Sequence, residues 1–268
     1  MVPSSKTPGD AVADSDALVE EGLRLATSAA KSGIALKLTG SAAIRVLRPQ
    51  AVPVLEALGR RALRDLDFFA LNSQAKRVES LFAAHGYEMD PSVKHSQEFG
   101  IKRHIYVDAH QRYKVDVFLD DLVMAHTVHM KDRLDLPGPT ISVADLLLSK
   151  LQIHEITRND LLDTIALLAG PDGIGESTDE PTTARLLGIF RDDWGFWYTA
   201  TRNLDAVERE LTECWQVLGS SADLVAVRLR SLQGLLNEVP KSLKWKMRGR
   251  VGARTRWYEE VSEVDRET

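Results

Sequence analysis

Three aspartates, at positions 65, 67 and 116, occur at spacings that suit the binding of a divalent cation. One residue separates Asp65 from Asp67, so in a β-strand their carboxylates point to the same face of the sheet. Asp116 stands between two valines in a later apolar segment, and a strand there would complete a cluster of three carboxylates if it pairs beside the first. Such a cluster repels itself in a partly dry site, whereas Mg²⁺ takes hard oxygen ligands and relieves the repulsion. These residues therefore predict a Mg²⁺ site with Asp65, Asp67 and Asp116 as catalytic residues and metal ligands.

A Gly-Ser pair precedes these aspartates and has the composition of a phosphate-binding turn. Gly40 lets the backbone approach a phosphate closely, and Ser41 offers its amide and hydroxyl at the start of a predicted helix. Two Mg²⁺ ions at a phosphorus centre hold both the attacking and the leaving oxygen. The combination favours phosphoryl transfer. The structural alternatives are Ser41 as a helix N-cap and Asp116 as a solvent-facing acid on an amphipathic strand.

Periodic patterns predict the elements that position these residues. The strands expected from alternating or continuous apolar runs are 34–39, 66–71, 103–108 and 113–119, the last two forming a hairpin. The helices expected in the same half begin at Ala17, with a stop at Gly33, and cover 41–47 and 73–84. Residues 48–64 are predicted to form a Pro-containing loop with one helical turn. Residues 87–101 show no clear period and are predicted to be irregular.

The chain beyond Pro139 is predicted to be helical. Segments 142–156 and 158–170 have helical periodicity, and the acidic, Gly-rich segment 171–181 has the composition of a linker. The expected fold class is therefore α+β, a mixed β-sheet flanked by helices and followed by a C-terminal helical domain. We expect a flexible tail at 1–16, a catalytic domain at 17–170 and a helical domain at 171–268.

The order of these motifs resembles that of the nucleotidyltransferase superfamily with the DNA polymerase β-like catalytic fold. The motifs stand here as LTGSAAIRVL, RDLDFF and KVDVFL, over roughly residues 34–168. The segment SVADLLLSKLQIHEITRNDLLDTIALL also resembles a helical part of the abortive-infection type nucleotidyltransferase toxins and their uncharacterised relatives. The interval between Ser41 and Asp65 is longer than in those relatives, and the excess falls in the predicted loop 48–64.

The resemblance implies roles for individual residues. Asp65 and Asp67 would bind Mg²⁺ and the triphosphate of an NTP, and Asp116 would bind the second metal ion and help to activate the incoming hydroxyl. Gly40 and Ser41 would hold the β- and γ-phosphates. Lys150 would contact a phosphate, with Asp160 and Asp163 as its supports.

The implied activity is transfer of a nucleoside monophosphate from an NTP to an acceptor hydroxyl, with release of pyrophosphate. The acceptor, whether a small molecule, an RNA or a protein, is not defined by the metal motif. Two alternatives stay open: a non-catalytic protein that keeps the fold and binds nucleic acid or a partner, and the toxin of a two-gene toxin–antitoxin system.

A basic segment near the C-terminus is a second candidate for function. Residues 241–256 contain seven Lys or Arg residues and no acid, with Trp245 inside the segment and Trp257 beside it. Cations with interleaved aromatic residues suit RNA, through phosphate contacts and base stacking. The alternative is a solvated helix face whose tryptophans are buried.

Other residues with reactive side chains give weaker patterns. His126 and His129 have the spacing of two ligands to one metal ion, but no third ligand accompanies them, so hydrogen-bonded histidines are expected. Cys214 lies in a helical pattern and is expected to be buried.

Composition places the chain among ordinary globular proteins. Its 268 residues are 44% hydrophobic and 27% charged, which excludes extensive disorder and a fibrous repeat. The net charge of −5 argues against a general polyanion binder but allows a local basic patch. A single cysteine, no signal-peptide pattern and no long apolar run predict a cytoplasmic protein with no membrane association.

Overall fold

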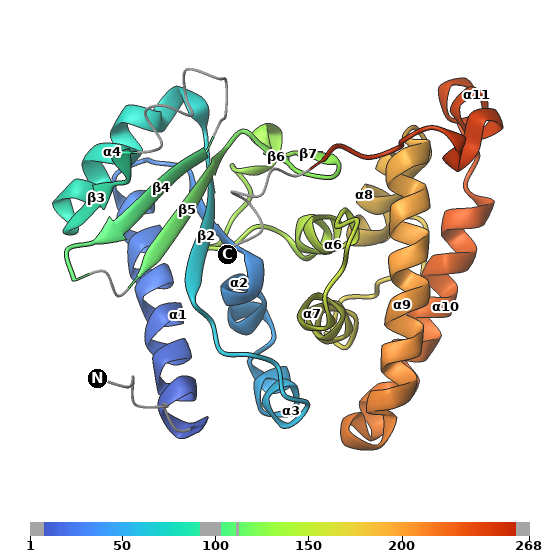
Figure 1. The fold of residues 1–268 in the computed structure, drawn as a ribbon, viewed down its shortest axis with the longest axis horizontal. Coiled ribbons are helices and arrows are strands. Elements are labelled where there is room, and N and C mark those ends of the chain that lie inside the picture. The colour runs from blue at the N-terminus through green and yellow to red at the C-terminus, as the bar shows by residue number, and fades with distance from the viewer. Residues whose placement is uncertain (1–7, 92–102, 111–112, 261–268) are drawn as a thin grey trace. The chain divides into compact units, whose positions relative to one another are not determined.

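The computed structural model describes residues 8–91, 103–110 and 113–260 of the chain (Figure 1). These residues form a mixed five-stranded sheet, a small two-stranded sheet and many helices, which confirms the α+β class. The strands are β1 (Leu36–Thr39), β2 (Asp65–Ala70), β3 (Tyr87–Met89), β4 (Arg103–Asp108), β5 (Lys114–Leu119), β6 (Asp121–Val123) and β7 (Thr127–His129). The helices are α1 (Pro8–Lys31), α2 (Gly40–Leu47), α3 (Val52–Ala57), α4 (Ala75–Ala84), α6 (Val143–Leu151), α7 (Arg158–Leu168), α8 (Pro181–Phe190), α9 (Trp194–Leu218), α10 (Ser220–Glu238) and α11 (Leu243–Val251).

The described residues divide into two compact units. The sheet unit contains Met1–Leu47, Arg61–Leu122 and His129–Ile141, and the helical unit contains Arg48–Arg60, Val123–Val128 and Ser142–Thr268. Helices α6 and α7 therefore belong to the helical unit. The domain limits at 17–170 and 171–268 stay a prediction.

The large sheet has the strand order β1-β2-β5-β4-β3. Strand β1 is antiparallel to β2, β2 is parallel to β5, and β4 is antiparallel to both β5 and β3. Because successive side chains of a strand alternate between faces, β2 and β5 each present one apolar face. The apolar residues on that face are Leu66, Phe68 and Ala70 of β2 and Val115, Val117 and Leu119 of β5, all buried.

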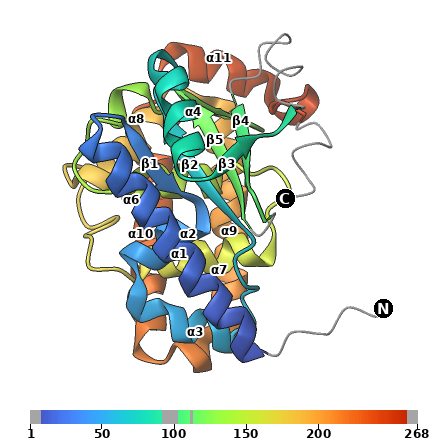
Figure 2. The same ribbon diagram turned by 90° about the vertical axis from the view of Figure 1, so that its left-hand side faces the viewer.

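Helices α1 and α4 cover this apolar face (Figure 2). Phe82 of α4 is fully buried and stacks on Tyr106 of β4, with ring centroids 4.3 Å apart. It also meets the Phe68 ring edge-on at 6.3 Å. On α1, Gly22 lies so close to the sheet that a Cβ atom there would sit 3.0 Å from Leu38. The opposite face of β2 and β5 carries the aspartates.

The structure differs from the sequence predictions at three places. Helix α1 begins at Pro8 rather than Ala17, because proline is well tolerated in the first turn of a helix. Residues 87–89 form the edge strand β3, which is too short to show a period. Residues 92–101 of the segment predicted to be irregular lie outside the described part of the chain. Helix α6 ends at Leu151, earlier than predicted.

Buried side chains of α9 and α10 satisfy the carbonyl groups at the ends of α6 and α7. Asn203 donates to the carbonyls of Leu151 at 3.0 Å and Ile153 at 2.8 Å. Arg228 donates to the carbonyl of Leu168 at 2.9 Å and to that of Gly170. These carbonyls have no partner within their own helices, so the contacts tie the helical unit together. None of the helices in the described part of the chain has the length and apolar character needed to cross a bilayer.

Replacing Phe82 with alanine tests the packing of α4 on the sheet. We expect Phe82→Ala to lower the free energy of unfolding by about 3–5 kcal/mol, because a large buried ring is lost and a cavity remains. Urea unfolding followed by circular dichroism measures this difference. Val227→Ala, at a side chain that is 59% exposed, serves as the control and should change little. Equal effects of the two substitutions would contradict this packing.

Candidate active site

The register of the central strands places two of the three predicted aspartates side by side. Asp67 on β2 is paired with Asp116 on the parallel strand β5. Paired residues of adjacent strands point to the same face, so both carboxylates lie on the face opposite α1 and α4. Asp65, two residues before Asp67 on β2, lies on this face too, and its partner on β5 is Lys114. Asp116 is fully buried, whereas Asp65 and Asp67 are half-buried.

Gly40 stands against Asp67 at the start of α2. It follows β1 directly, and β1 pairs with β2 so that Thr39 is opposite Asp67. The φ angle of Gly40 is +64°, a conformation that side chains other than glycine adopt at a cost. A Cβ atom here would lie 2.5 Å from Oδ2 of Asp67. Only glycine therefore fits between the helix start and this carboxylate.

Ser41 is the second residue of α2 and is half-buried. Its position at the start of an eight-residue helix puts its backbone amide among those that lack a partner inside the helix. Such amides, with the positive end of the helix dipole, favour an anionic group. The predicted Gly-Ser turn and Asp67 are thus neighbours in the structure.

Two cations neutralise Asp116. Arg103 of β4 donates from Nε to Oδ1 of Asp116 at 3.2 Å, and its Nη2 lies 3.0 Å from Oδ2. Nζ of Lys114 lies 3.7 Å from the same Oδ2. Within the described part of the chain, this buried Oδ2 accepts no hydrogen bond of good geometry. The negative charge on this oxygen is therefore balanced by the ion pairs with Arg103 and Lys114 rather than by a hydrogen bond.

Arg103 was not among the residues proposed from the sequence. It is paired with Phe118 on β5, and its guanidinium lies 5.3 Å from the centre of that ring. The signal was available, because alternation within the predicted hairpin puts Arg103 on the same face as Asp116. The sequence alone did not show that the two residues are also near each other along the strands.

The site has part of the donor set that Mg²⁺ needs. Over residues 8–91, 103–110 and 113–260, no group of three or more His, Cys, Asp or Glu side chains is placed to hold a metal ion. The predicted three-carboxylate cluster is therefore not assembled, and the pair Asp67 and Asp116 is what the register provides. Mg²⁺ is commonly held by one or two carboxylates together with substrate phosphates, so this pair suits it. The buried Oδ2 of Asp116 that accepts no hydrogen bond agrees with that assignment.

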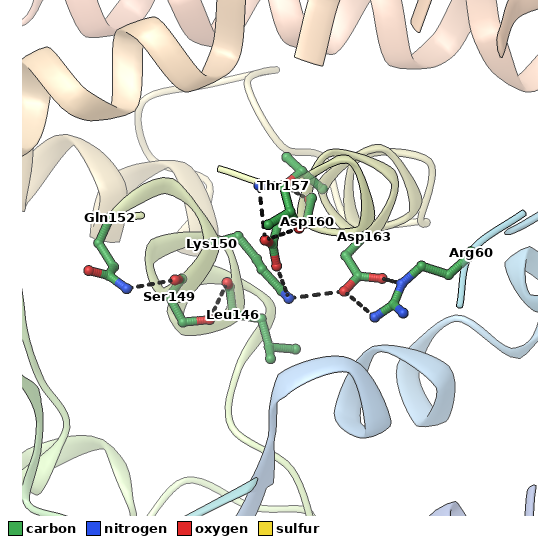
Figure 3. Close-up of polar contacts among 9 residues, drawn as sticks. Arg60, Leu146, Ser149, Lys150, Gln152, Thr157, Asp160 and Asp163 are labelled. Atoms are coloured by element: carbon green, nitrogen blue, oxygen red, sulfur yellow. Dashed lines mark hydrogen bonds and ion pairs between the residues drawn. The ribbon is translucent and has the colours of Figure 1, made fainter. Parts of the chain in front are cut away.

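Lys150 lies in the helical unit, within a closed group of charges (Figure 3). Its Nζ on α6 lies 2.8 Å from Oδ1 of Asp160 and 3.0 Å from Oδ2 of Asp163, both on α7. Arg60 binds Asp163 from the other side with two hydrogen bonds, of 2.8 and 3.0 Å. The hydroxyl of Thr157 donates to Asp160 at 2.6 Å, and the same two residues form the capping box of α7 through their backbone amides. The expectation that Asp160 and Asp163 support Lys150 agrees with this geometry, while the phosphate contact stays a prediction.

The charges in this group shift one another's pKa. Burial by itself raises the pKa of Asp163, but Lys150 and Arg60 outweigh it and hold the pKa below its usual range. Burial likewise raises the pKa of Asp160, and Lys150 again lowers it on balance. Burial lowers the pKa of Lys150, and the two carboxylates raise it on balance. The group is therefore fully charged near neutral pH.

The histidine and cysteine candidates have structural partners. His126 is buried, stacks on Phe196 at 5.0 Å and shares a hydrogen bond of 2.8 Å with Thr199. Burial lowers the pKa of His126 to about 4, so it is neutral near pH 7. His129 is exposed and contacts Asp121 at 2.9 Å. Cys214 is buried as expected, and burial with a hydrogen bond to Glu210 raises the pKa of its thiol to about 11.

The sequence matches no protein-family model and no curated protein. The resemblance to nucleotidyltransferases therefore rests on the motifs themselves.

Gly40→Ala tests the close approach of α2 to Asp67. The substitution introduces both an unfavourable φ angle and a Cβ atom at 2.5 Å from the carboxylate. Gly86→Ala is the matched control, because φ is +81° there and nothing lies within 4 Å of the added Cβ. We expect both to lose about 1–2 kcal/mol of stability through backbone strain, and Gly40→Ala to lose at least about 1 kcal/mol more. Equal losses in urea unfolding would show that Asp67 does not confine Gly40.

Lys150→Met tests the charge group on α6 and α7. It removes the cation between buried Asp163, which keeps Arg60, and half-buried Asp160, which keeps the hydrogen bonds of Thr157. We expect this to lower the free energy of unfolding by about 3–5 kcal/mol. Lys131→Met, at an exposed position, is the control and should have little effect.

The pH dependence gives a second readout of the same substitution. In the wild type, Asp160 and Asp163 have lowered pKa values, so their contribution is present above about pH 4 and is lost as the pH falls further. The raised pKa of Lys150 keeps its contribution intact up to about pH 10. In Lys150→Met the stability should fall less steeply between pH 4 and pH 2. If the free energy of unfolding, measured by urea titration, fell equally steeply with pH in Lys150→Met and the wild type, Lys150 would not be the cation that lowers the pKa values of Asp160 and Asp163.

Proposed function

We propose that the chain is a Mg²⁺-dependent nucleotidyltransferase, which moves a nucleoside monophosphate from an NTP to an acceptor hydroxyl and releases pyrophosphate. One observation carries the proposal: Asp67 and Asp116 are in register on neighbouring parallel strands, with Gly40 closing against Asp67 at a helix start. This is part of the arrangement that the resemblance to the nucleotidyltransferase superfamily implies for its Gly-Ser and aspartate motifs.

Each residue has a role in this proposal. Asp67 and Asp116 would hold Mg²⁺, and Asp65, on the same face of β2, would add negative charge beside them without acting as a third ligand. The bound ion would neutralise the triphosphate and polarise the α-phosphorus. The first amides of α2, at Gly40 and Ser41, would bind phosphate oxygens.

The reaction itself requires positioning more than covalent help from the protein. The acceptor oxygen forms a bond to the α-phosphorus while the bond to the bridging oxygen breaks and pyrophosphate leaves. Asp116 would take the proton of the acceptor hydroxyl. Arg103 and Lys114 would balance the charge of the carboxylates when no nucleotide is present.

A second candidate is a non-catalytic protein that keeps the fold. The contact between Arg103 and Asp116 favours it, because the guanidinium already neutralises a carboxylate that the enzymatic proposal assigns to a metal ion. The two candidates differ in whether the aspartates are needed for any activity. Within the enzymatic proposal, growth arrest on expression that Asp65→Ala relieves would identify a toxin of a two-gene system.

The proposal is tested with Asp67→Asn/Asp116→Asn and purified wild type. Each protein receives Mg²⁺ and α-labelled NTPs, with total cellular RNA and a small-molecule extract as acceptor pools. We expect wild type to label one pool and the variant to label it more than about 100-fold less, since even indirect supports of metal ligands cost 10–100-fold. The labelled pool identifies the acceptor class.

The control for this experiment is Asp132→Asn, an exposed aspartate in the sheet unit, which should keep full activity. Thermal unfolding of all three proteins establishes that they are folded. Full transfer by the double variant would refute the proposed site, and absence of both transfer and NTP binding in wild type would favour the non-catalytic candidate.

A further inference from the structure

Helix α11 is attached to α9 through its tryptophan. Ser242 caps the helix by accepting a hydrogen bond from the amide of Trp245 at 3.2 Å. The Trp245 ring packs edge-on against Trp197 of α9, with centroids 5.1 Å apart. Gly249, one turn later, lies against Trp194, where a Cβ atom would be 3.1 Å from the ring. The aromatic side of α11 is therefore turned toward the protein.

Some cations of the segment 241–256 take part in this attachment. Lys241 lies 5.4 Å from the centre of the Trp197 ring and 5.3 Å from that of Trp245. Arg248 lies 4.8 Å from the centre of the Trp194 ring and donates to the carbonyl of Gly252 at 2.7 Å. These contacts are cation–π interactions and hydrogen bonds that hold the segment together. They leave the other cations to solvent.

Four cations form an exposed basic array: Lys244, Lys246, Arg250 and Arg254. Across the described residues, these four side chains take part in no hydrogen bond or ion pair. No Asp or Glu occurs between Glu238 and Glu259 to balance them. Four like charges within eleven residues repel one another, and binding to a polyanion relieves this repulsion and releases counterions from the polyanion.

We propose that this basic array binds the phosphate backbone of a nucleic acid. The proposal does not depend on the aspartate site or on catalysis. Because Trp245 is turned toward α9, the array offers charge and no aromatic stacking surface, so we infer binding that is independent of base sequence.

An anionic membrane is the competing partner, because Leu243, Met247 and Val251 are also exposed. Helices that lie in a membrane interface usually present a broad apolar face with aromatic residues. Here the aromatic residue of α11 packs inward, and the array extends past the helix to Arg254. Both features favour a phosphate chain.

The test measures binding of the full-length protein to a fluorescent 20-nucleotide single-stranded RNA, and to DNA of the same sequence, by anisotropy at several NaCl concentrations. For four phosphate contacts, log Kd should rise with log salt with a slope of about 3, which is a loss of about 50-fold in affinity between 50 and 200 mM. The RNA and DNA arms show which nucleic acid binds more tightly. Two RNAs of different sequence should bind equally.

The decisive variant is Lys244→Gln/Lys246→Gln/Arg250→Gln/Arg254→Gln, which should abolish the salt-dependent binding. The matched control is Lys31→Gln/Lys76→Gln/Lys131→Gln/Arg209→Gln, which changes the net charge by the same amount at exposed positions elsewhere. Arg250→Lys/Arg254→Lys keeps the charge and should retain affinity. Equal affinities of the decisive variant and the matched control would overturn the proposal.

Vesicles of phosphatidylglycerol, with phosphatidylcholine vesicles for comparison, test the membrane alternative. Leu243→Ser/Met247→Ser should leave nucleic-acid binding unchanged. Co-sedimentation of wild type with phosphatidylglycerol vesicles, lost in this variant, together with no binding to RNA or DNA, would assign the surface to a membrane instead.

Discussion

The parallel pairing of β2 with β5 is the constraint on which the sheet unit depends. It joins two strands that are far apart in the sequence and gives both the same alternation, apolar toward α1 and α4 and acidic on the other face. A shift of one residue would turn Asp67 toward the face packed under α1 and α4 and move Phe68 to the opposite face. Packing of Phe68 and Tyr106 against Phe82 therefore also fixes the place of Asp67 beside Asp116.

Two groups of buried or half-buried charges, one in each unit, contain charges of both signs. Asp116 is balanced by Arg103 and Lys114 in the sheet unit. In the helical unit, Lys150 and Arg60 balance Asp160 and Asp163. Such pairs add little net stability relative to apolar residues of the same size, but the loss of one partner is costly.

The two proposed activities use different physical means. The aspartate pair would act through hard oxygen donors brought together by strand register, which requires positions fixed to a fraction of an ångström. The array on α11 would act through charge density alone, which tolerates imprecise geometry and depends on salt. A chain with a net charge of −5 can combine them because residues 241–256 contain seven Lys or Arg residues and no acid.

The sequence by itself determined the elements whose signals are local. The alternation of RHIYVD and KVDVFL predicted β4 and β5, and the helical periodicity of 142–156 and 158–170 predicted α6 and α7. The Gly-Ser and aspartate motifs were recognisable for the same reason, since each lies within a few residues. Only the tertiary structure decided which strands are neighbours, that Arg103 reaches Asp116, and which cations of 241–256 face solvent. Those outcomes depend on contacts between residues distant in the chain, which arise when the apolar faces pack and which no short sequence window contains.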